Sequence, residues 1–200
     1  MSDTDAEARR YLSNSHFESQ RAQEVFVSLY ADNLIAAAEA IGECFRAGGK
    51  VLIFGNGGSA ADAQHMAAEF VGRLMTEREP LPAIALTTDS SNLTAIGNDY
   101  GYEQVFSRQV AGLAKPGDVV VAISTSGNSP NVVHAACDAQ RLGCKVISLT
   151  GGSGGKLAYA SDINLNVSEG KNSCRIQETH IFIIHSLVDL VDRFFLEETT

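Results

Sequence analysis

The chain has 200 residues, of which 44% are apolar and 20% charged, and it contains 18 glycines. This length and balance fit one globular domain and exclude a chain too polar to bury a core. A net charge of −9 excludes non-specific nucleic-acid binding, which needs a basic surface, so local donors must hold any phosphate.

The first 48 residues carry no strand signal. Apolar residues from Phe26 to Phe45 recur at helical spacing, which predicts one or two helices ending at Gly48-Gly49. The start lacks the apolar core of a signal peptide, and no later stretch approaches the ~20 apolar residues of a membrane span. We therefore expect a cytoplasmic protein without membrane contact. The cysteines lie far apart, so we expect reduced thiols.

From Lys50 onward, short apolar strands alternate with loops and helices, which predicts an α/β class with a parallel sheet covered on both faces. A strand order of 2-1-3-4-5 would place the loops after the first and third strands side by side. We expect one domain, with residues 1–48 as a helical segment that packs in an oligomer and 49–200 as the core with its C-terminal helix. Predicted strands are 50–54, 82–87, 118–123, 145–149 and 162–167, and predicted helices are 59–74, 91–113, 130–142 and 174–196.

Two loops have unusual chemistry. Gly55-Asn56-Gly57-Gly58-Ser59 leads directly into a helix, where glycines allow close backbone approach and Ser59 can cap the helix beside an anion. Ser124-Thr125-Ser126-Gly127-Asn128-Ser129-Pro130 offers four hydroxyls before a proline suited to a first helical turn. Each loop alone could be a capped turn, but the pair indicates a phosphate or sugar site. Neither is a Walker loop or a dinucleotide fingerprint.

Polar side chains on two helices form a second candidate group. His65 and Glu69, four residues apart, share one helix face and could hold a divalent metal such as zinc, or simply contact each other on the surface. The C-terminal helix is apolar nearly all round, which suggests burial between subunits. Its polar exceptions need partners, which could be a metal or hydrogen bonds across an interface. These exceptions are Gln177, Glu178, His180 and His185.

Three segments together resemble the sugar isomerase (SIS) family, and within it the phosphoheptose isomerases. The segments are GNGGSAADAQHMAAEF, ISTSGNS and RIQETHIFIIH, and the resemblance runs from about residue 48 to the end. It implies a zinc ion in each subunit, a homotetramer with shared sites, and Glu69 and His185 as the acid-base pair. The implied metal ligands are His65, Glu69, Gln177 and His185. The implied substrate contacts are Asn56, Gly57, Gly58, Ser59, Glu69, Asn98, Asp99, Ser124, Thr125, Ser126, Ser129 and Gln177.

The reaction that the resemblance implies is conversion of sedoheptulose 7-phosphate to D-glycero-D-manno-heptose 7-phosphate, a precursor of bacterial surface heptose in lipopolysaccharide. It needs a base to move a proton between C1 and C2, and an acid or metal to stabilise the enediolate oxygen. Arg73 could help bind the phosphate or pair with Glu69. Residues 97–103 read on their own as a structural turn.

The ligand set poses a geometrical difficulty. Gln177 and His185 are eight residues apart on one helix, so they differ by ~12 Å along the axis and about 80° around it. Either the helix is broken or the site mixes ligands from two chains. We expect the second, since the apolar helix already indicates packing in an oligomer.

Two rival functions remain. A non-enzymatic SIS module that binds a replication initiator protein would lack acid-base residues, whereas Glu69, Gln177 and His185 are all present. An isomerase of amino-sugar phosphates would usually carry a second SIS domain or a longer chain.

Overall fold

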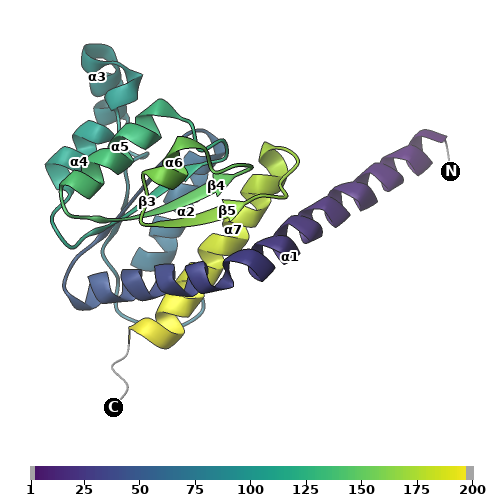
Figure 1. Cartoon of the computed structure of the whole chain (residues 1–200), viewed down its shortest axis with the longest axis horizontal. Helices are drawn as coiled ribbons and strands as arrows, with labels where there is room; N and C mark the ends of the chain where they lie inside the picture. Colours follow the sequence, from purple (N-terminus) through teal and green to yellow (C-terminus); the bar gives the residue numbers. More distant parts are fainter. Residues whose placement is uncertain (1–2, 197–200) are drawn as a thin grey trace.

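The computed structural model describes residues 3–196. They form a five-stranded parallel sheet of order β2-β1-β3-β4-β5 with helices on both faces (Figure 1). The predicted α/β class and strand order are confirmed. The strands are β1 Val51–Gly55, β2 Ala83–Ala85, β3 Val119–Ser124, β4 Lys145–Gly151 and β5 Ile163–Val167.

Alternate side chains of the central strands β1 and β3 enter two separate cores because strand side chains point to opposite faces. Val51 and Ile53 of β1 join the core beneath α1, α2 and α7, while Leu52 and Phe54 join the core beneath α4, α5 and α6. These two strands are therefore apolar on both faces, as the sequence predicted, whereas β5 has asparagines on one face. The helices are α1 Asp3–Arg46, α2 Gly58–Val71, α3 Ser90–Tyr100, α4 Ser107–Leu113, α5 Pro130–Arg141, α6 Gly155–Tyr159 and α7 Ser173–Leu190.

The N-terminal segment is one continuous helix of 44 residues, α1, and not two. Its C-terminal half packs on α7 and β5, whereas its N-terminal half extends beyond the body (Figure 1). That half exposes Tyr11, Leu12 and Phe17, and burial along α1 begins only at Ala22. A long helix with an apolar face and no partner on this chain has surface available for another one.

α1 is also longer and more apolar than the sequence led us to expect. By length and composition it could cross a membrane, since its most apolar window of 18 residues has a mean hydropathy of 1.3. A third of that window is buried inside the protein, and a core helix of a protein outside the membrane meets the same criterion. The expectation that no stretch would approach this threshold is therefore wrong for α1.

The predicted helix 91–113 is two helices joined by a short 3-10 turn, η1 (Tyr102–Gln104). The break falls at Gly101, whose φ of 86° lies outside the helical region and suits glycine. α6 was not predicted, because five residues are too few to show a helical period. α7 continues as a π-helical turn, η2 (Val191–Phe195).

A buried carboxylate ties together the chain segments at the amino-terminal edge of the sheet. Asp118 accepts hydrogen bonds from the backbone amides of Lys50 (3.0 Å) and Lys115 (2.7 Å), and it pairs with the Lys50 ammonium. Burial alone would raise the pKa of Asp118, but these donors together lower it below its ordinary value. The starts of β1 and β3 are therefore held by one ionised side chain.

Replacing Asp118 with asparagine should lower the free energy of unfolding at pH 7 by about 1–3 kcal/mol, because a charged acceptor of three donors is lost. Because folding lowers the pKa of Asp118, its stabilisation is present above the unfolded pKa of about 4 and is lost as the pH falls through the folded value. The difference between variant and parent should therefore shrink below about pH 4. Urea unfolding at several pH values measures it.

The matched control is Asp138→Asn, since Asp138 forms a more exposed pair with Arg141. A loss of stability at Asp118 no larger than at Asp138, or independent of pH, would contradict the assigned role.

Candidate active site

The loops after β1 and β3 lie side by side at the carboxyl edge of the sheet, as predicted. β1 pairs directly with β3, with Gly55 opposite Ile123, so both loops leave the sheet at the point where the strand order reverses. The side-chain amides of Asn56 and Asn131 join the two loops through hydrogen bonds of 2.8 and 2.9 Å. Sequence analysis missed Asn131, although it directly follows Pro130.

The glycine loop differs from its prediction in one respect. α2 begins at Gly58 with Gly57 in the N-cap position, so Ser59 lies inside the first turn and does not cap the helix. Ser59 is nevertheless buried next to the loop, 3% exposed. The Ser59 and Ala60 amides of this turn donate to the Asn56 and Gly57 carbonyl oxygens, and no side chain caps the helix.

The hydroxyl loop after β3 is a compact cluster. Ser124 Oγ lies 3.0 Å from Ser129 Oγ and 3.5 Å from Ser126 Oγ, and the Asn128 amide donates to Ser126 Oγ. Pro130 occupies the first turn of α5, with Ser129 as the N-cap residue, as predicted. Hydroxyls and the start of α5 thus converge on one point, which suits an anion.

A third loop, after β4, supports the hydroxyl loop and was not singled out from the sequence. The Leu157 amide donates to the Gly127 carbonyl, and the Lys156 amide donates to Asn128 Oδ1. A Cβ on Gly127 would lie 2.0 Å from the Gly154 carbonyl oxygen, so glycine is required at this contact. The signal in the sequence was the glycine-rich segment Gly151–Gly155.

His65 of α2 and His185 of α7 meet within one chain. Their Nε2 atoms are 2.8 Å apart, with ring centroids separated by 5.0 Å. Glu69, one turn after His65, places Oε1 3.6 Å from His65 Nε2, and its side chain is 19% exposed. Three of the four predicted metal ligands therefore gather at one place.

Gln177, the fourth predicted ligand, lies at the start of α2. A Cβ on Gly58 would lie 2.4 Å from Gln177 Nε2, so the glycine makes room for this amide. α2 and α7 are therefore parallel, because Gln177 lies at Gly58 and His185 lies at His65, seven residues further along α2. The contact between His65 and His185 therefore brings these two ligands together within one chain, whereas Gln177 lies about two turns, ~10 Å, away along α2.

A buried ion pair holds the end of α2 that carries Glu69. Arg78 donates to the carbonyl oxygens of Glu69 (2.9 Å) and Phe70 (2.8 Å), and its Nε donates to Asp192 Oδ1 (2.6 Å) in η2. The Arg78 side chain is 10% exposed and that of Asp192 1%. Arg78 thereby satisfies carbonyls that a helix end leaves unpaired and links α2 to the chain that follows α7.

Asp62, one turn before His65, is a further acidic group at this helix. It is 6% exposed, and its Oδ2 has no hydrogen-bond partner among the residues that the structure describes. Burial raises the pKa of Asp62 to about 6, and nearby His65 opposes that change.

Other predicted polar residues lie apart from this cluster. Asn98 and Asp99 are exposed in the last turn of α3 and bonded to each other, at 2.7 Å. Arg73 pairs with Glu77 and not with Glu69, and Glu178 pairs with Arg175. His180 is fully buried and bonds the Thr150 carbonyl, and burial lowers its pKa to about 4, so its partner is the sheet and not a metal.

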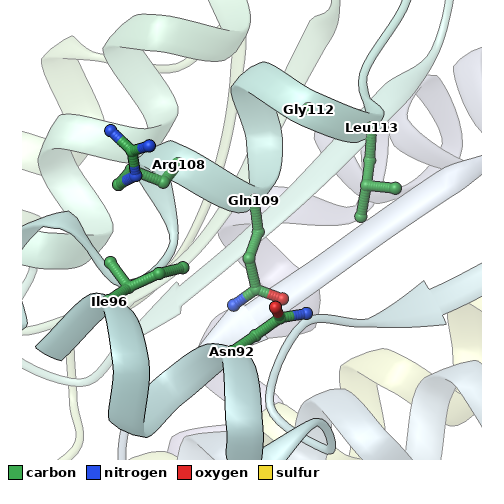
Figure 2. A pocket seen from close by; sticks show the side chains of 6 residues that line it. All are labelled: Asn92, Ile96, Arg108, Gln109, Gly112 and Leu113. Carbon is green, nitrogen blue, oxygen red and sulfur yellow. The ribbon is translucent and has the colours of Figure 1, made fainter.

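The surface cavities do not coincide with the loop cluster. One of about 360 Å³ lies between α3 and α4, where the Gln109 and Asn92 amides face each other (Figure 2), and it contains none of the predicted site residues. A smaller one of about 260 Å³ adjoins His185 and Phe182 on α7. The first cavity therefore lies apart from the candidate site, whereas the second borders it at His185.

The donor atoms of His65, Glu69 and His185 are of the kinds that bind zinc. Two imidazole nitrogens and a carboxylate oxygen are the ligands of many catalytic zinc sites, and they leave a position open for substrate. As the side chains stand, however, no group of three or more His, Cys, Asp or Glu within residues 3–196 forms a complete metal cluster. The amide oxygen of Gln177, on α7, is a further donor near the start of α2.

Residues 17–151 match the SIS domain family. A phosphoheptose isomerase from Aquifex aeolicus is 50% identical over 182 residues, which are 91% of this chain and 95% of the relative. The structure of a phosphoheptose isomerase from Neisseria gonorrhoeae has a TM-score of 0.87 and 46% identity, covering 92% of this chain and 98% of that one. A phosphoheptose isomerase from Francisella tularensis has a TM-score of 0.86 and 42% identity, covering 96% and 100%.

These matches agree with the loop and helix geometry, since they extend through both loops and over nearly the whole length of the relatives. The chain belongs to the SIS domain family and, within it, to the phosphoheptose isomerases.

Proposed function

We propose that this chain is a cytoplasmic aldose-ketose isomerase that converts sedoheptulose 7-phosphate to D-glycero-D-manno-heptose 7-phosphate, for bacterial surface heptose. The observation that carries the proposal is the convergence of His65, Glu69 and His185 beside the two ligand-binding loops. The names of the relatives support the substrate class, because each is called a phosphoheptose isomerase.

The reaction moves a proton between C1 and C2 of the sugar, which requires a base and an acid on the same substrate. Glu69 is a half-buried carboxylate on α2, and His185 lies opposite on α7, so the two groups come from separate helices that face each other. We assign Glu69 and His185 as the acid-base pair. Gln177, beside the glycine loop, then contacts the sugar.

His65, Glu69 and His185 would hold the zinc ion. A neighbouring chain would supply the fourth ligand, Gln177, because Gln177 of the same chain lies about two turns, ~10 Å, away along α2. Bound zinc would supply positive charge that stabilises the developing oxyanion of the substrate. Without it, the same side chains still hold a proton near this position, because one Nε2 atom of the imidazole pair must donate to the other at 2.8 Å.

The hydroxyl loop is the proposed phosphate site. Ser124, Ser126 and Ser129 cluster within 3.5 Å of one another through Ser124, at the start of α5. The loop from Ser124 to Pro130 contains neither lysine nor arginine, so neutral hydroxyl and amide donors bind the anion. Such donors suit a chain with a net charge of −9.

The proposed assembly is a homotetramer in which α1 forms subunit contacts. Tyr11, Leu12 and Phe17 are each more than 60% exposed on the half of α1 that extends beyond the body. Neighbouring chains would cover this apolar surface and bring further residues, such as Asn98 and Asp99, near a partner's site.

Glu69→Gln and His185→Ala should each lower kcat for sedoheptulose 7-phosphate by about 10²–10⁴-fold, because an acid or base typically contributes that much. Aldose formation followed by NMR measures the rate, and circular dichroism checks the fold. Bound zinc measured on the same preparations shows whether a variant lost the metal as well.

Glu77→Gln and His134→Ala are the matched controls, since Glu77 and His134 are exposed and lie outside the cluster. They should keep the parent's rate. Near-normal turnover in Glu69→Gln or His185→Ala would refute the acid-base assignment, and an inactive parent would refute the proposed substrate.

Replacing Ser124 and Ser126 together with alanine should raise KM for the sugar phosphate more than it lowers kcat. The phosphate does not react, so its contacts stabilise the bound substrate and the transition state alike. Steady-state kinetics on the doubly substituted protein measure both constants. If KM is unchanged, the phosphate binds elsewhere.

The parent protein should sediment at about four times its chain mass of 21.3 kDa. Replacing Leu12 and Phe17 with glutamate should reduce that mass, because charges in a buried apolar contact are costly. Tyr159→Glu is the control, since Tyr159 is 92% exposed on α6. A monomeric parent, or an unchanged mass in the doubly substituted protein, would contradict the α1 interface.

A further inference from the structure

The amide pair between the two loops has a defined polarity. Asn131, in the first turn of α5, is 3% exposed, so its side chain exchanges no bonds with bulk water. Its Oδ1 accepts from Asn56 Nδ2 at 2.8 Å, and its Nδ2 donates to Asn56 Oδ1 at 2.9 Å. The two amides therefore form a closed ring of two hydrogen bonds.

A backbone amide determines which way round this ring is. The Val132 N–H lies 3.0 Å from Asn131 Oδ1, and a backbone N–H can only donate. Asn131 must keep its oxygen on that side, so it directs its NH₂ group toward Asn56. Asn56 must then meet that donor with its own oxygen.

Tyr102 adds a second donor to the same oxygen. Its hydroxyl lies 3.2 Å from Asn56 Oδ1, which thus accepts from both Asn131 and Tyr102. A hydroxyl can donate or accept, so Tyr102 strengthens the arrangement without selecting it. Because Tyr102 follows α3 directly, this bond also connects α3 to the glycine loop.

One polar group of the Asn56 side chain makes no hydrogen bond within the part of the chain that the structure describes. Its oxygen accepts two bonds, and one N–H of its Nδ2 donates to Asn131. The second N–H has no hydrogen-bond partner among the residues that the structure describes, and Asn56 is only half-buried between the two loops. Asn56 therefore presents a donor, and no acceptor, at the edge of the sheet.

We infer that Asn131 is a positioning residue that fixes the amide orientation of Asn56, so that Asn56 offers an N–H to an oxygen of the sugar phosphate; this inference rests on the proposed isomerase function. Without Asn131, the Asn56 amide can turn by half a revolution. Its oxygen then faces the substrate oxygens, and the contact becomes repulsive.

Two variants at Asn131 test the inference on the zinc-loaded full chain. Asn131→Leu removes both bonds with little change in volume. Asn131→Asp keeps the shape and the acceptors, but it replaces the donor to Asn56 by a carboxylate oxygen. Each should lower kcat/KM for sedoheptulose 7-phosphate about tenfold, the order expected for a lost hydrogen bond.

The matched control is Gln109→Leu. Gln109 is 7% exposed and also makes two side-chain hydrogen bonds, to the Leu86 and Val105 carbonyls, but on α4. It should lose comparable stability on thermal unfolding and keep kcat/KM near the parent's value. An equal loss of kcat/KM at Gln109 would reduce Asn131 to a packing residue and overturn the inference.

A double-mutant cycle separates positioning from packing. If Asn131 acts through Asn56, the Asn56→Ala, Asn131→Leu protein should be within about twofold of Asn56→Ala alone. Single-variant effects that multiply in the double variant would overturn the inference. Parent-like kcat/KM in both Asn131→Leu and Asn131→Asp would also overturn it.

A readout independent of turnover distinguishes failure of the inference from failure of the proposed function. In ¹⁵N spectra, with the Asn56 signals identified by their loss in Asn56→Ala, one Asn56 N–H should exchange slowly with solvent and the other rapidly. Asn131→Leu should make both exchange rapidly. Two rapid signals in the parent would overturn the inference, whereas this pattern with no isomerase turnover would refute only the proposed function.

Discussion

The parallel packing of α2 and α7 on one face of the sheet is the constraint on which the chemistry depends. α2 follows β1 and α7 follows β5, so both helices start at the carboxyl edge of the sheet. Residues at the same distance from that edge therefore meet. His65 and His185 form one such pair, and Gly58 and Gln177 form another. The proposed reactive groups therefore lie between two helices, of which α2 begins at the glycine loop.

Ion pairing and burial hold α2 and α7 in a fixed position relative to each other. Arg78 binds carbonyls at the end of α2 and pairs with Asp192 just after α7, so the two helices are joined at their far ends as well as at their starts. Removing one partner of such a buried pair typically costs about 3–5 kcal/mol. His180 anchors α7 to β4 through the Thr150 carbonyl. The proposed acid-base groups thus lie on two helices that are held together at both ends and anchored to the sheet. This suits groups that must keep their separation during proton transfer.

The sequence was most informative where periodicity and loop chemistry coincide. Apolar strands separated by helices predicted the sheet and its order, and the two glycine- and hydroxyl-rich loops were placed together correctly. Contacts between distant residues were harder. Neither helix taken alone signals that α2 and α7 pack in parallel and bring His65 to His185. Gln177 and His185 meet α2 about two turns apart, so a site with ligands from two chains stays a prediction. Asn131 could not be singled out because its role depends on Asn56, which is 75 residues away in the chain.

Hydrogen-bond polarity is the least visible of these properties in a sequence. The side-chain amides of Asn56 and Asn131 could pair in either orientation, and the Val132 N–H selects one of them. The same reasoning explains how an acidic chain can bind an anionic substrate. In the proposed site, the donors of fixed direction are the serine hydroxyls and one N–H of Asn56. Directed neutral donors bind a phosphate sugar without a compensating cluster of cations, because each donor is already oriented before the ligand arrives.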